Sequence, residues 1–503
     1  MENSPGIDKR ITVTDAQALG LLIAGATCLR LIFAQTGLGI DETYTVATSR
    51  NFHLSFFDHP PVAWWLSWLM QTIFHSDAPF IVRLPFIALS GVATWQVHRL
   101  TKLLFGSKAG LFAATAFVCA PALGMTSGTW VLPDGPLLVG LLAAAICLAR
   151  LLFCGEAKGW LWLAAGFWGG FALLSKYHGV FLFLGTGLFI LMTPSMRHWL
   201  KTIWPYLGGL IGLAVFSPAL VWNDEHHWIS FAFQSGRASQ THIHVLRPVL
   251  TLMGQAVFLT PWLWFGLVCA VVQAVKDDGL NRRKRFLLCM AMPQILLFTL
   301  VSMGSTSATL YHWAMPGYMF LLPLLGDWLA RLHARRPVFV ERIVRASVSF
   351  VAILVSTVTL LWFLPFKDLP VAKDPLAAMR PLDGFNAYLE AEKLSAANLI
   401  VAPTKWYLAG QFDYALKGQS RVTCFCEDAR EYRIIAPLND MTGKDFIIPM
   451  PMKNAEKSGQ DLIPFFAHID RLKDFTVMRG NGVLEKFAVF YGKDLKRAPF
   501  GTE

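Results

Sequence analysis

The feature that most constrains this chain is a series of long apolar runs that recurs from Thr14 to about Phe366. A helix needs about 20 consecutive, mostly apolar residues to cross a hydrocarbon core that is about 30 Å thick. The composition fits such crossings, because 54% of the 503 residues are hydrophobic and only 15% are charged. We therefore expect a polytopic membrane protein whose membrane part is an all-α bundle.

The apolar runs suffice for about eleven transmembrane helices. Lys9 and Arg10 precede the first run, and no small-residue cleavage site follows a short apolar core. We therefore expect the first helix to be retained as a start-transfer helix. The predicted spans lie near residues 14–37, 80–100, 108–124, 133–153, 159–174, 177–193, 200–220, 249–275, 285–302, 311–330 and 344–366.

The formal net charge of +11 is concentrated in short loops between these runs. Arg282-Arg-Lys-Arg285 and the arginines between Arg331 and Arg345 are examples, and they alternate with loops that carry few basic residues. Basic loops remain on the cytoplasmic side of a membrane. We therefore expect these arginines to set the topology rather than to bind nucleic acid, and an odd number of spans places the tail from Lys367 outside.

The tail has a different character, and it divides the chain into predicted domains at residues 1–366 and 367–503. Short apolar runs at 398–402 and 446–448 alternate with turns, and a helix is expected near 387–397. This pattern predicts a small α/β domain outside the cytoplasm. A glycine-rich nucleotide-binding fingerprint is absent from the sequence.

The eight cysteines fall into two groups. Cys424 and Cys426 belong to the tail, where an oxidising compartment permits a disulfide. Because only one residue separates them, the ring would be strained, and free thiols are the alternative. The others lie in or beside spans and are expected to be inert apolar residues: Cys28, Cys119, Cys147, Cys154, Cys269 and Cys289.

The first outer loop, residues 39–79, concentrates unusual polar residues. Asp41 and Glu42 stand where the first apolar run ends, and Asp58-His59 precedes two prolines. Acids at a membrane surface favour a functional reading, although the end of a span explains one acidic pair equally well. The run from Val62 to Met70 carries three tryptophans and is expected to form a helix on the outer leaflet, with a short re-entrant or spanning helix as the alternative.

Other polar residues are also expected at the outer ends of spans. Acids suit proton removal from an attacking hydroxyl, whereas cations suit an anionic phosphate. The candidates for binding a donor phosphate are His59, Arg83, Lys176 and Arg237. The candidates for catalysis are Asp41, Glu42 and Asp134, and those for shaping the cavity are Tyr44, Asp58, His178, Tyr311 and His312.

Several histidines leave undecided whether the protein has a metal site. His226 and His227 follow Asp224 and Glu225, and further histidines stand at 242 and 244. Their spacing matches no metal motif, and such histidines more often form hydrogen bonds. We expect no certain cofactor, with a divalent metal ion as an open alternative.

Taken together, these motifs resemble those of the GT-C glycosyltransferases that use polyprenyl-phosphate sugars, within the protein O-mannosyltransferase and aminoarabinose-lipid A transferase group. The resemblance spans most of the chain. The matching pieces are Asp41-Glu-Thr-Tyr44, Phe57-Asp-His-Pro-Pro61, Arg83, Pro133-Asp-Gly-Pro136, Ser175-Lys176, Tyr311-His-Trp-Ala-Met-Pro316 and Trp406-Tyr-Leu-Ala-Gly-Gln-Phe-Asp-Tyr414.

The resemblance implies a GT-C bundle in a bacterial inner membrane, with the active site and the tail domain on the periplasmic side. It implies that Asp41 matches the catalytic acid of the family. One position departs from the pattern, because His59 stands where aminoarabinose transferases have a lysine. A neutral histidine donates one hydrogen bond without a full charge, so the phosphate would depend more on other cations.

The expected activity is transfer of a sugar from an undecaprenyl-type phosphate to a lipid or glycolipid acceptor, such as lipid A or lipopolysaccharide core. Within the same group, a protein O-mannosyltransferase is an alternative. From another class, a transporter or lipid flippase also needs polar residues in a helical bundle, but usually near the membrane midplane. The candidates here cluster at the outer ends of spans instead.

Overall fold

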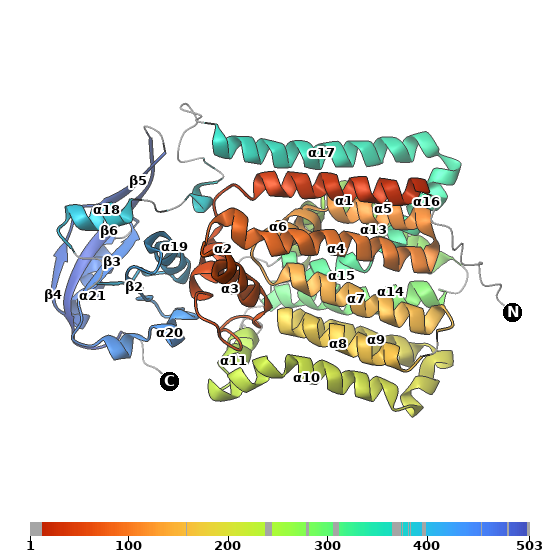
Figure 1. Cartoon of the computed structure of the whole chain (residues 1–503), viewed down its shortest axis with the longest axis horizontal. Helices are drawn as coiled ribbons and strands as arrows, with labels where there is room; N and C mark the ends of the chain where they lie inside the picture. Colours follow the sequence, from red (N-terminus) through yellow and green to blue (C-terminus); the bar gives the residue numbers. More distant parts are fainter. Residues whose placement is uncertain are drawn as a thin grey trace. The chain divides into compact units, whose positions relative to one another are not determined.

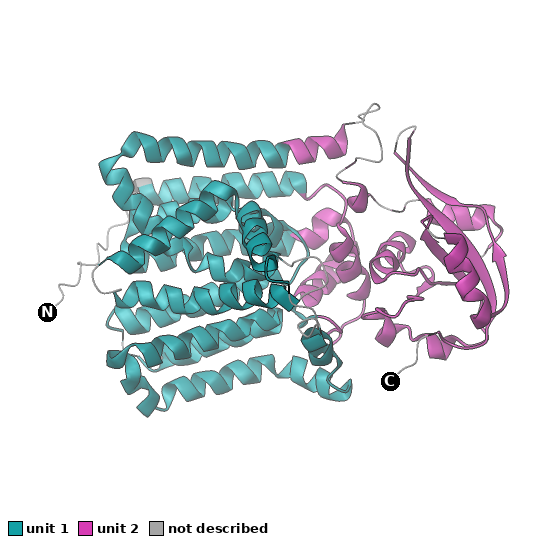
Figure 2. Ribbon diagram, turned by 180° about the vertical axis from the view of Figure 1, so that it is seen from behind, with its two compact units in different colours: residues 1–33, 59–62, 84–356 teal, residues 34–58, 63–83, 357–503 magenta. Residues whose placement is uncertain are grey.

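The computed structural model describes residues 13–156, 158–236, 244–277, 281–304, 311–364, 374, 376–380, 382, 384–394, 399–453, 455–479 and 482–499. Within these residues the chain forms two compact units (Figure 2). Unit 1 comprises residues 1–33, 59–62 and 84–356. Unit 2 comprises residues 34–58, 63–83 and 357–503. The tail therefore shares a unit with most of the first outer loop, which the predicted boundary at 366 separated from it.

Unit 1 is a bundle of helices that run alongside one another (Figure 1). Six helices of the described chain are long and apolar enough to cross a membrane, or up to nine if each bent pair counts as one span. The long helices are α1 (Val13–Phe33), α4 (Pro79–Phe105), α7 (Asp134–Phe153), α10 (Trp204–Glu225), α14 (Arg282–Val301) and α17 (Pro337–Phe363). Both α4 and α17 extend into unit 2 at one end.

Shorter helices complete the bundle. They are α5 (Ser107–Cys119), α6 (Ser127–Thr129), α8 (Trp160–Ser175), α9 (Val180–Met192), α11 (Ile229–Gly236), α12 (Arg247–Leu259), α13 (Pro261–Lys276), α15 (Met315–Met319) and α16 (Leu322–Arg335). Small residues allow α8 and α10 to approach closely. A Cβ atom on Gly166 would lie 1.9 Å from the Gly208 carbonyl oxygen, and one on Gly170 would lie 2.4 Å from that of Gly212. Such small residues one turn apart are typical of helix contacts in membranes.

Prolines break two predicted spans. The predicted span at 249–275 consists of α12 and α13, which meet at an angle of 110°. Thr260 lies between them in the left-handed region, with φ of 74°, and Pro261 follows it. Proline lacks a backbone N–H and disfavours the helical conformation of the residue before it, so the helix ends there. The predicted span at 108–124 is likewise broken, because α5 and the segment Pro121–Thr129 meet at an angle of 80° and Pro121 begins the second piece. A third predicted span, at 311–330, is divided between α15 and α16.

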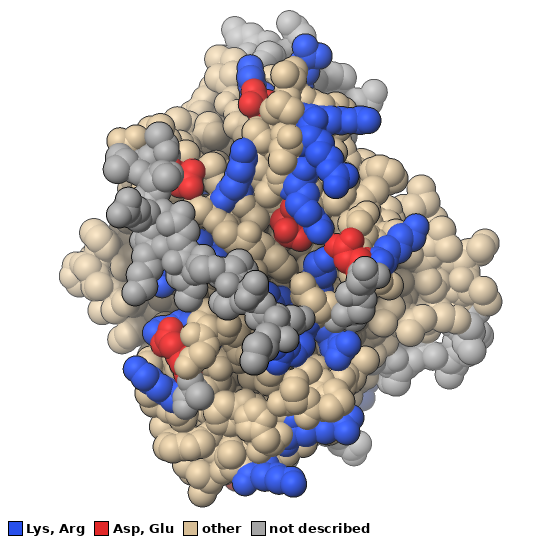
Figure 3. Space-filling view, turned by 90° about the vertical axis from the view of Figure 1, so that its right-hand side faces the viewer, with Lys and Arg blue, Asp and Glu red and all other residues tan. Residues whose placement is uncertain are grey.

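One end of the bundle is basic. Figure 3 looks at the end where α7 passes into α8 and α16 into α17, and Lys and Arg are far more frequent there than Asp and Glu. Exposed arginines of the loops that were expected to be cytoplasmic include Arg282, Arg335 and Arg336. Such an excess of Lys and Arg is typical of the cytoplasmic side of membrane proteins.

Unit 2 contains a mixed sheet, which confirms the α/β character predicted for the tail. The strands follow the order β2-β1-β3-β6-β4, and β5 also pairs with β6. β1 is parallel to β2 and β3, whereas β6 is antiparallel to its neighbours. The strands are β1 (Ile400–Val401), β2 (Arg421–Val422), β3 (Phe446–Pro451), β4 (Phe466–Arg471), β5 (Phe475–Arg479) and β6 (Gly482–Leu495).

The helices of unit 2 come from both ends of the chain. The first outer loop forms α2 (Ile40–Thr48) and α3 (Val62–Phe74), whose first residue belongs to unit 1. The helix predicted from Val62 is present, while its place on the membrane surface stays a prediction. The tail forms α18 (Phe385–Ala391), α19 (Trp406–Leu416), α20 (Tyr432–Ile435) and α21 (Ala455–Leu462). The helix expected at 387–397 ends earlier, at Ala391.

Candidate functional site

The two adjacent acids of the first loop occupy different environments. Asp41 and Glu42 lie in the first turn of α2, where the positive end of the helix dipole favours acids. Asp41 is exposed, whereas Glu42 is completely buried. Because successive residues of a helix point in different directions, only Asp41 presents its carboxylate to the surroundings.

Glu42 and Arg83 form a buried ion pair within unit 2. The Arg83 guanidinium donates to Glu42 at 2.8 Å through Nε and at 2.5 Å through an Nη atom, and both side chains have no exposed surface. Arg83 also donates to the carbonyl oxygens of Thr36 and Gly37 at 2.9 Å and 2.8 Å. Glu42 in turn accepts from the backbone N–H of Gly39 at 2.8 Å.

This ion pair bears on the roles expected of Arg83 and Glu42. Arg83 uses its guanidinium to bind protein atoms in a closed environment, which favours a structural role over phosphate binding. Glu42 is its buried partner, while its predicted part in catalysis stays a prediction. The pair fixes the start of α2 against α4, and thereby holds the helix turn that carries Asp41.

Two residues predicted to line a cavity, Tyr44 and Asp58, lie in a buried cluster of hydrogen-bonded side chains in unit 2. The Tyr44 hydroxyl donates to Asp58 Oδ1 at 3.2 Å, and Arg430 donates to Asp58 Oδ2 at 3.1 Å. Burial raises the Tyr44 pKa well above its ordinary value, and the charges of Asp58 and Glu431 add to the effect. The two first-loop motifs are therefore bound to each other and to the tail.

Arg430 and Glu431 were not predicted from the sequence. Arg430 stacks on the Trp406 ring with its guanidinium carbon 3.4 Å from the ring centroid. Glu431 is completely buried and accepts from the backbone N–H of Phe57 at 2.7 Å. Burial, the largest cause, raises the Glu431 pKa to about 8, and the charge of Asp58 also raises it. Nothing in a single sequence relates position 431 to position 57.

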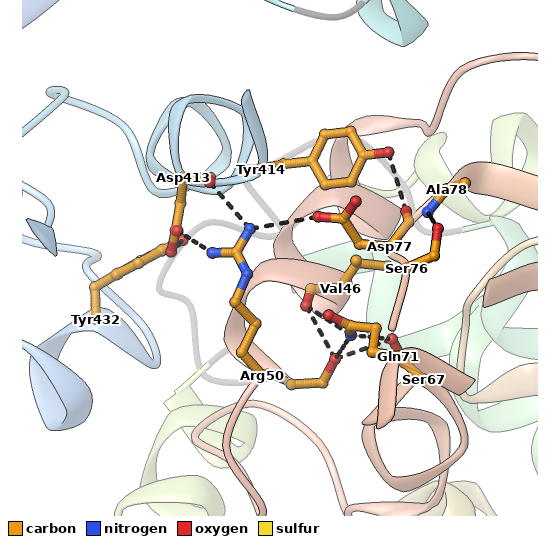
Figure 4. Close-up of polar contacts among 11 residues, drawn as sticks. Val46, Arg50, Ser67, Gln71, Ser76, Asp77, Ala78, Asp413, Tyr414 and Tyr432 are labelled. Carbon is orange, nitrogen blue, oxygen red and sulfur yellow. Dashed lines mark hydrogen bonds and ion pairs between the residues drawn. The ribbon is translucent and has the colours of Figure 1, made fainter. Parts of the chain in front are cut away.

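A second network joins the first loop to the tail (Figure 4). Arg50 forms an ion pair with Asp413 and donates to the Asp413 carbonyl oxygen at 3.1 Å. The Tyr432 hydroxyl donates to the other carboxylate oxygen of Asp413 at 2.9 Å, and Asp77 lies 3.8 Å from Arg50. Burial raises the Asp413 pKa, while Arg50 and Tyr432 act in the opposite direction. Asp413 belongs to the tail signature on which the resemblance relied.

Unit 1 brings together another group of predicted residues. Asp134, the first residue of α7, accepts from Lys176 Nζ at 2.9 Å through each of its oxygens. Lys176 follows the last residue of α8, and its side chain is only 4% exposed. His59 and His312 lie close enough to Asp134 to interact electrostatically with it. Four residues that the sequence placed at outer span ends therefore form one cluster.

His178 and Tyr311 pack beside this cluster rather than within it. The His178 ring stacks on Phe298 with the centroids 4.9 Å apart and makes an edge contact with Trp313. The Tyr311 ring lies against α12, where a Cβ atom on Gly254 would come within 2.3 Å of it. The connection between α8 and α9 is a single short turn from Tyr177 to Gly179.

Two further expectations concern the segment that follows α10, where Arg237 was expected to bind a phosphate and histidines left a metal site open. Arg237 and His242 lie outside the residues that the structure describes. In the described part of the chain, no group of three or more His, Cys, Asp or Glu is arranged to hold a metal ion. A divalent ion therefore has no candidate ligand set among those residues, and the metal requirement stays open.

The tail cysteines are resolved as a disulfide. Cys424 and Cys426 are joined, and Cys426 Sγ also contacts the carbonyl oxygen of Asp428 at 3.2 Å. Of the two alternatives that the sequence left open, the structure shows the bond. The disulfide ends four residues before Arg430, in the segment that leads to the buried cluster of Tyr44 and Asp58.

Each unit thus contributes chemistry of a different kind. Unit 2 presents an exposed carboxylate, Asp41, on a helix start that buried ion pairs hold in place. Unit 1 presents a cation, Lys176, with an acid and two imidazoles around it. A carboxylate such as that of Asp41 can orient or deprotonate a hydroxyl. A cation such as Lys176 can stabilise an anionic leaving group.

Comparisons with known proteins agree with these features. A family model described as dolichyl-phosphate-mannose-protein mannosyltransferase matches residues 58–222. The lipid A galacturonosyltransferase RgtD of Rhizobium johnstonii is 24% identical over 318 residues, which are 62% of this chain. The aligned region spans 65% of the length of that relative.

Solved structures share the fold over almost the whole chain. ArnT from Cupriavidus metallidurans bound to undecaprenyl phosphate has a TM-score of 0.65 at 16% identity, covering 95% of this chain and 98% of that one. The archaeal oligosaccharyltransferase AglB from Archaeoglobus fulgidus has a TM-score of 0.52 at 11% identity, covering 82% of this chain and 65% of that one. At these identities the likeness shows a common fold, in which a helical membrane bundle is followed by a smaller domain.

Proposed function

We propose that this chain, a GT-C glycosyltransferase of the protein O-mannosyltransferase and aminoarabinose-lipid A transferase group, transfers one sugar from a polyprenyl phosphate to lipid A or lipopolysaccharide core. The reaction takes place at the periplasmic face of a bacterial inner membrane. The name of RgtD supports lipid A as the acceptor, and the undecaprenyl phosphate bound to ArnT supports the donor class.

The observation that carries the proposal is the contrast between Asp41 and Glu42. Arg83 neutralises Glu42 in a closed environment, so the exposed Asp41 is the carboxylate of the first-loop motif that can reach a substrate. Asp41 lies at a helix start whose dipole favours its ionised form. It therefore suits a general base, or a group that orients the attacking oxygen.

In the proposed reaction, an acceptor oxygen attacks the anomeric carbon of the sugar. The bond between that carbon and the phosphate oxygen breaks, and the polyprenyl phosphate leaves with both bonding electrons. Asp41 takes the proton when the acceptor is a hydroxyl, and only orients the acceptor when it is an ionised phosphate. Lys176 and His59 stabilise the charge on the leaving phosphate.

Replacement of Asp41 tests the assignment directly. The Asp41→Asn variant keeps the size of the side chain and removes its charge, so we expect kcat to fall by about 100-fold or more, as befits loss of general acid–base catalysis. Purified protein, a polyprenyl-phosphate sugar and lipid A form the assay, with loss of the lipid-linked sugar as the readout. Turnover of the variant near that of the wild type would contradict the role of Asp41.

The identity of the sugar and of the acceptor needs a separate experiment. Mass spectrometry of envelope glycolipids from cells with and without the gene reveals the mass that the enzyme adds and the molecule that carries it. A protein O-mannosyltransferase is the second candidate, because the description of the matching family model names a protein acceptor. Sugar on an envelope protein and unchanged lipid A would favour that candidate.

A further inference from the structure

Two residues of the tail contact both first-loop motifs. Arg430 binds Asp58, which precedes the His59-Pro-Pro segment, through an ion pair of 3.1 Å. The neighbouring residue Glu431 binds the backbone N–H of Phe57 at 2.7 Å. Its own backbone N–H donates to the Tyr44 hydroxyl on α2 at 3.1 Å. One dipeptide therefore connects the helix that carries Asp41 to the end of the first loop.

The contacts are buried and specific. The Asp58 side chain is 4% exposed and the Arg430 side chain 14%, so water screens their attraction weakly. Trp406 covers the guanidinium of Arg430 from one side. Placing an arginine here requires an acidic acceptor and an aromatic face at the same point, which a contact that only fills space does not.

The backbone at Arg430 supports the same interpretation. Its φ of 48° lies in the left-handed region, which side chains larger than that of glycine rarely adopt. Such strained residues persist where the surroundings over-determine them, and they concentrate at functional sites. The strain directs the Arg430 side chain to Asp58 while Glu431 continues into the start of α20.

We propose that Arg430 and Glu431 are positioning residues for the sugar transfer, with Glu431 fixing the Phe57-Asp58 backbone through its hydrogen bond to the Phe57 N–H. The inference rests on the proposed function and assigns part of the site to the tail domain. Arg430 orients Asp58 and Tyr44, and Tyr44 lies one turn after Asp41 on α2. Through these contacts the tail sets the orientation of Asp41 without touching a substrate.

The state of Glu431 links this arrangement to pH. The titratable and charged groups that face it are Asp58, Tyr44, Arg430 and Tyr432. Burial raises the Glu431 pKa to about 8, so the folded protein favours the protonated form of this acid at pH 7. Because this pKa is raised from its ordinary value of 4.5, the stabilisation from keeping Glu431 buried is lost progressively as pH rises from about 5 to about 8, where an ionised carboxylate would stand beside Asp58.

Three variants of the full chain test the proposal by sugar transfer. Glu431→Gln retains a neutral acceptor for the Phe57 N–H, so we expect it to keep kcat at pH 7 within about threefold and to lack the decline in kcat that we expect of the wild type as pH rises to about 8. Arg430→Gln is expected to lower kcat by at least tenfold with a smaller change in the KM for the donor. The control, Glu427→Gln, replaces an exposed acid of the same segment and should match the wild type.

Hydrogen exchange provides a readout that does not depend on transfer. We expect amides of α2 and of residues 53–58 to exchange faster in Arg430→Gln than in the wild type and Glu427→Gln. Wild-type exchange there should rise between pH 5 and pH 8 beyond the intrinsic effect of pH, and Glu431→Gln should show no such excess.

The two readouts separate the possible failures. Unchanged α2 exchange in Arg430→Gln, or the same excess between pH 5 and pH 8 in Glu431→Gln as in the wild type, would overturn the positioning proposal. A wild type that transfers no sugar while the exchange pattern is as expected would overturn the proposed function, but would support the hold of Arg430 and Glu431 on the first loop.

Discussion

At the scale of single residues, charge pairing separates structural groups from chemical ones. Asp41 and Glu42 are adjacent and chemically alike, but Asp41 is exposed, whereas Glu42 is buried against Arg83. The pair of Lys176 and Asp134 is intermediate between a structural and a chemical role. Its side chains are largely buried, yet two histidines lie near Asp134. A buried pair tolerates the loss of both charges better than the loss of one, since a single charge is then left without compensation.

Double replacement of the Lys176–Asp134 pair tests this principle. Lys176→Met leaves the Asp134 carboxylate without its cation, and we expect a loss of about 3 kcal/mol in stability. Adding Asp134→Asn should recover much of that loss, whereas sugar transfer stays low in both variants because the cation is missing. Thermal unfolding in detergent measures the first effect, and the lipid-linked sugar assay measures the second.

The exposed pair between Arg345 and Glu341 is a suitable control, with side chains 76% and 46% exposed. Breaking it by Arg345→Gln should cost less than about 1 kcal/mol. Equal losses of stability from Lys176→Met with and without Asp134→Asn would show that the two charges do not interact.

At the scale of secondary-structure elements, close approach between helices decides where the candidate acids lie. α19 of the tail packs directly on α2, and a Cβ atom on Gly410 would lie 2.7 Å from the Tyr44 Cα atom. The contact is between backbones, so neither side can yield by rotating a side chain. This contact and the Arg50–Asp413 network hold the first loop on the tail at two places.

Gly410→Ala tests the importance of that contact. In an unobstructed helix the change should stabilise the protein by up to about 1 kcal/mol, because alanine favours helix more than glycine does. Here we expect the opposite sign, with a loss of about 1–3 kcal/mol from overpacking and reduced sugar transfer. Gly209→Ala on α10 is the control, because nothing lies within 4 Å of its Cβ position. Equal melting temperatures for the two variants would show that α2 and α19 can separate at little cost.

At the scale of the whole molecule, the distribution of charge predicts an orientation. The basic end of the bundle should face the cytoplasm, which puts the tail and the outer loops in the periplasm. Lys457→Cys adds a thiol to an exposed position of α21, and Arg282→Cys adds one to an exposed position of the basic loop. A membrane-impermeant maleimide should label the first variant in intact spheroplasts and the second only after lysis.

The same labelling applies to the two clusters of candidate residues. Cysteines introduced at positions 41 and 134 should both react from the periplasmic side. Labelling of these two positions from opposite sides of the membrane would contradict the predicted topology, and with it the proposed transfer.

The sequence by itself determined the class of the protein, the helical bundle and the mixed character of the tail, because these depend on apolar run length, composition and local periodicity. It also located Asp41, Lys176 and Asp134 at the ends of helices. The prolines at 121 and 261 were a usable signal for the broken spans, since proline ends a helix by local chemistry.

Only the tertiary structure decided which charged residues are paired. Arg83 lies 41 positions from Glu42, and Arg430 lies 372 positions from Asp58. Whether an arginine binds a phosphate or a buried glutamate depends on what folding places beside it and on how much water remains there. The single sequence carries no record of these distances, so the roles of Glu42, Arg83 and Glu431 emerged only from the folded chain.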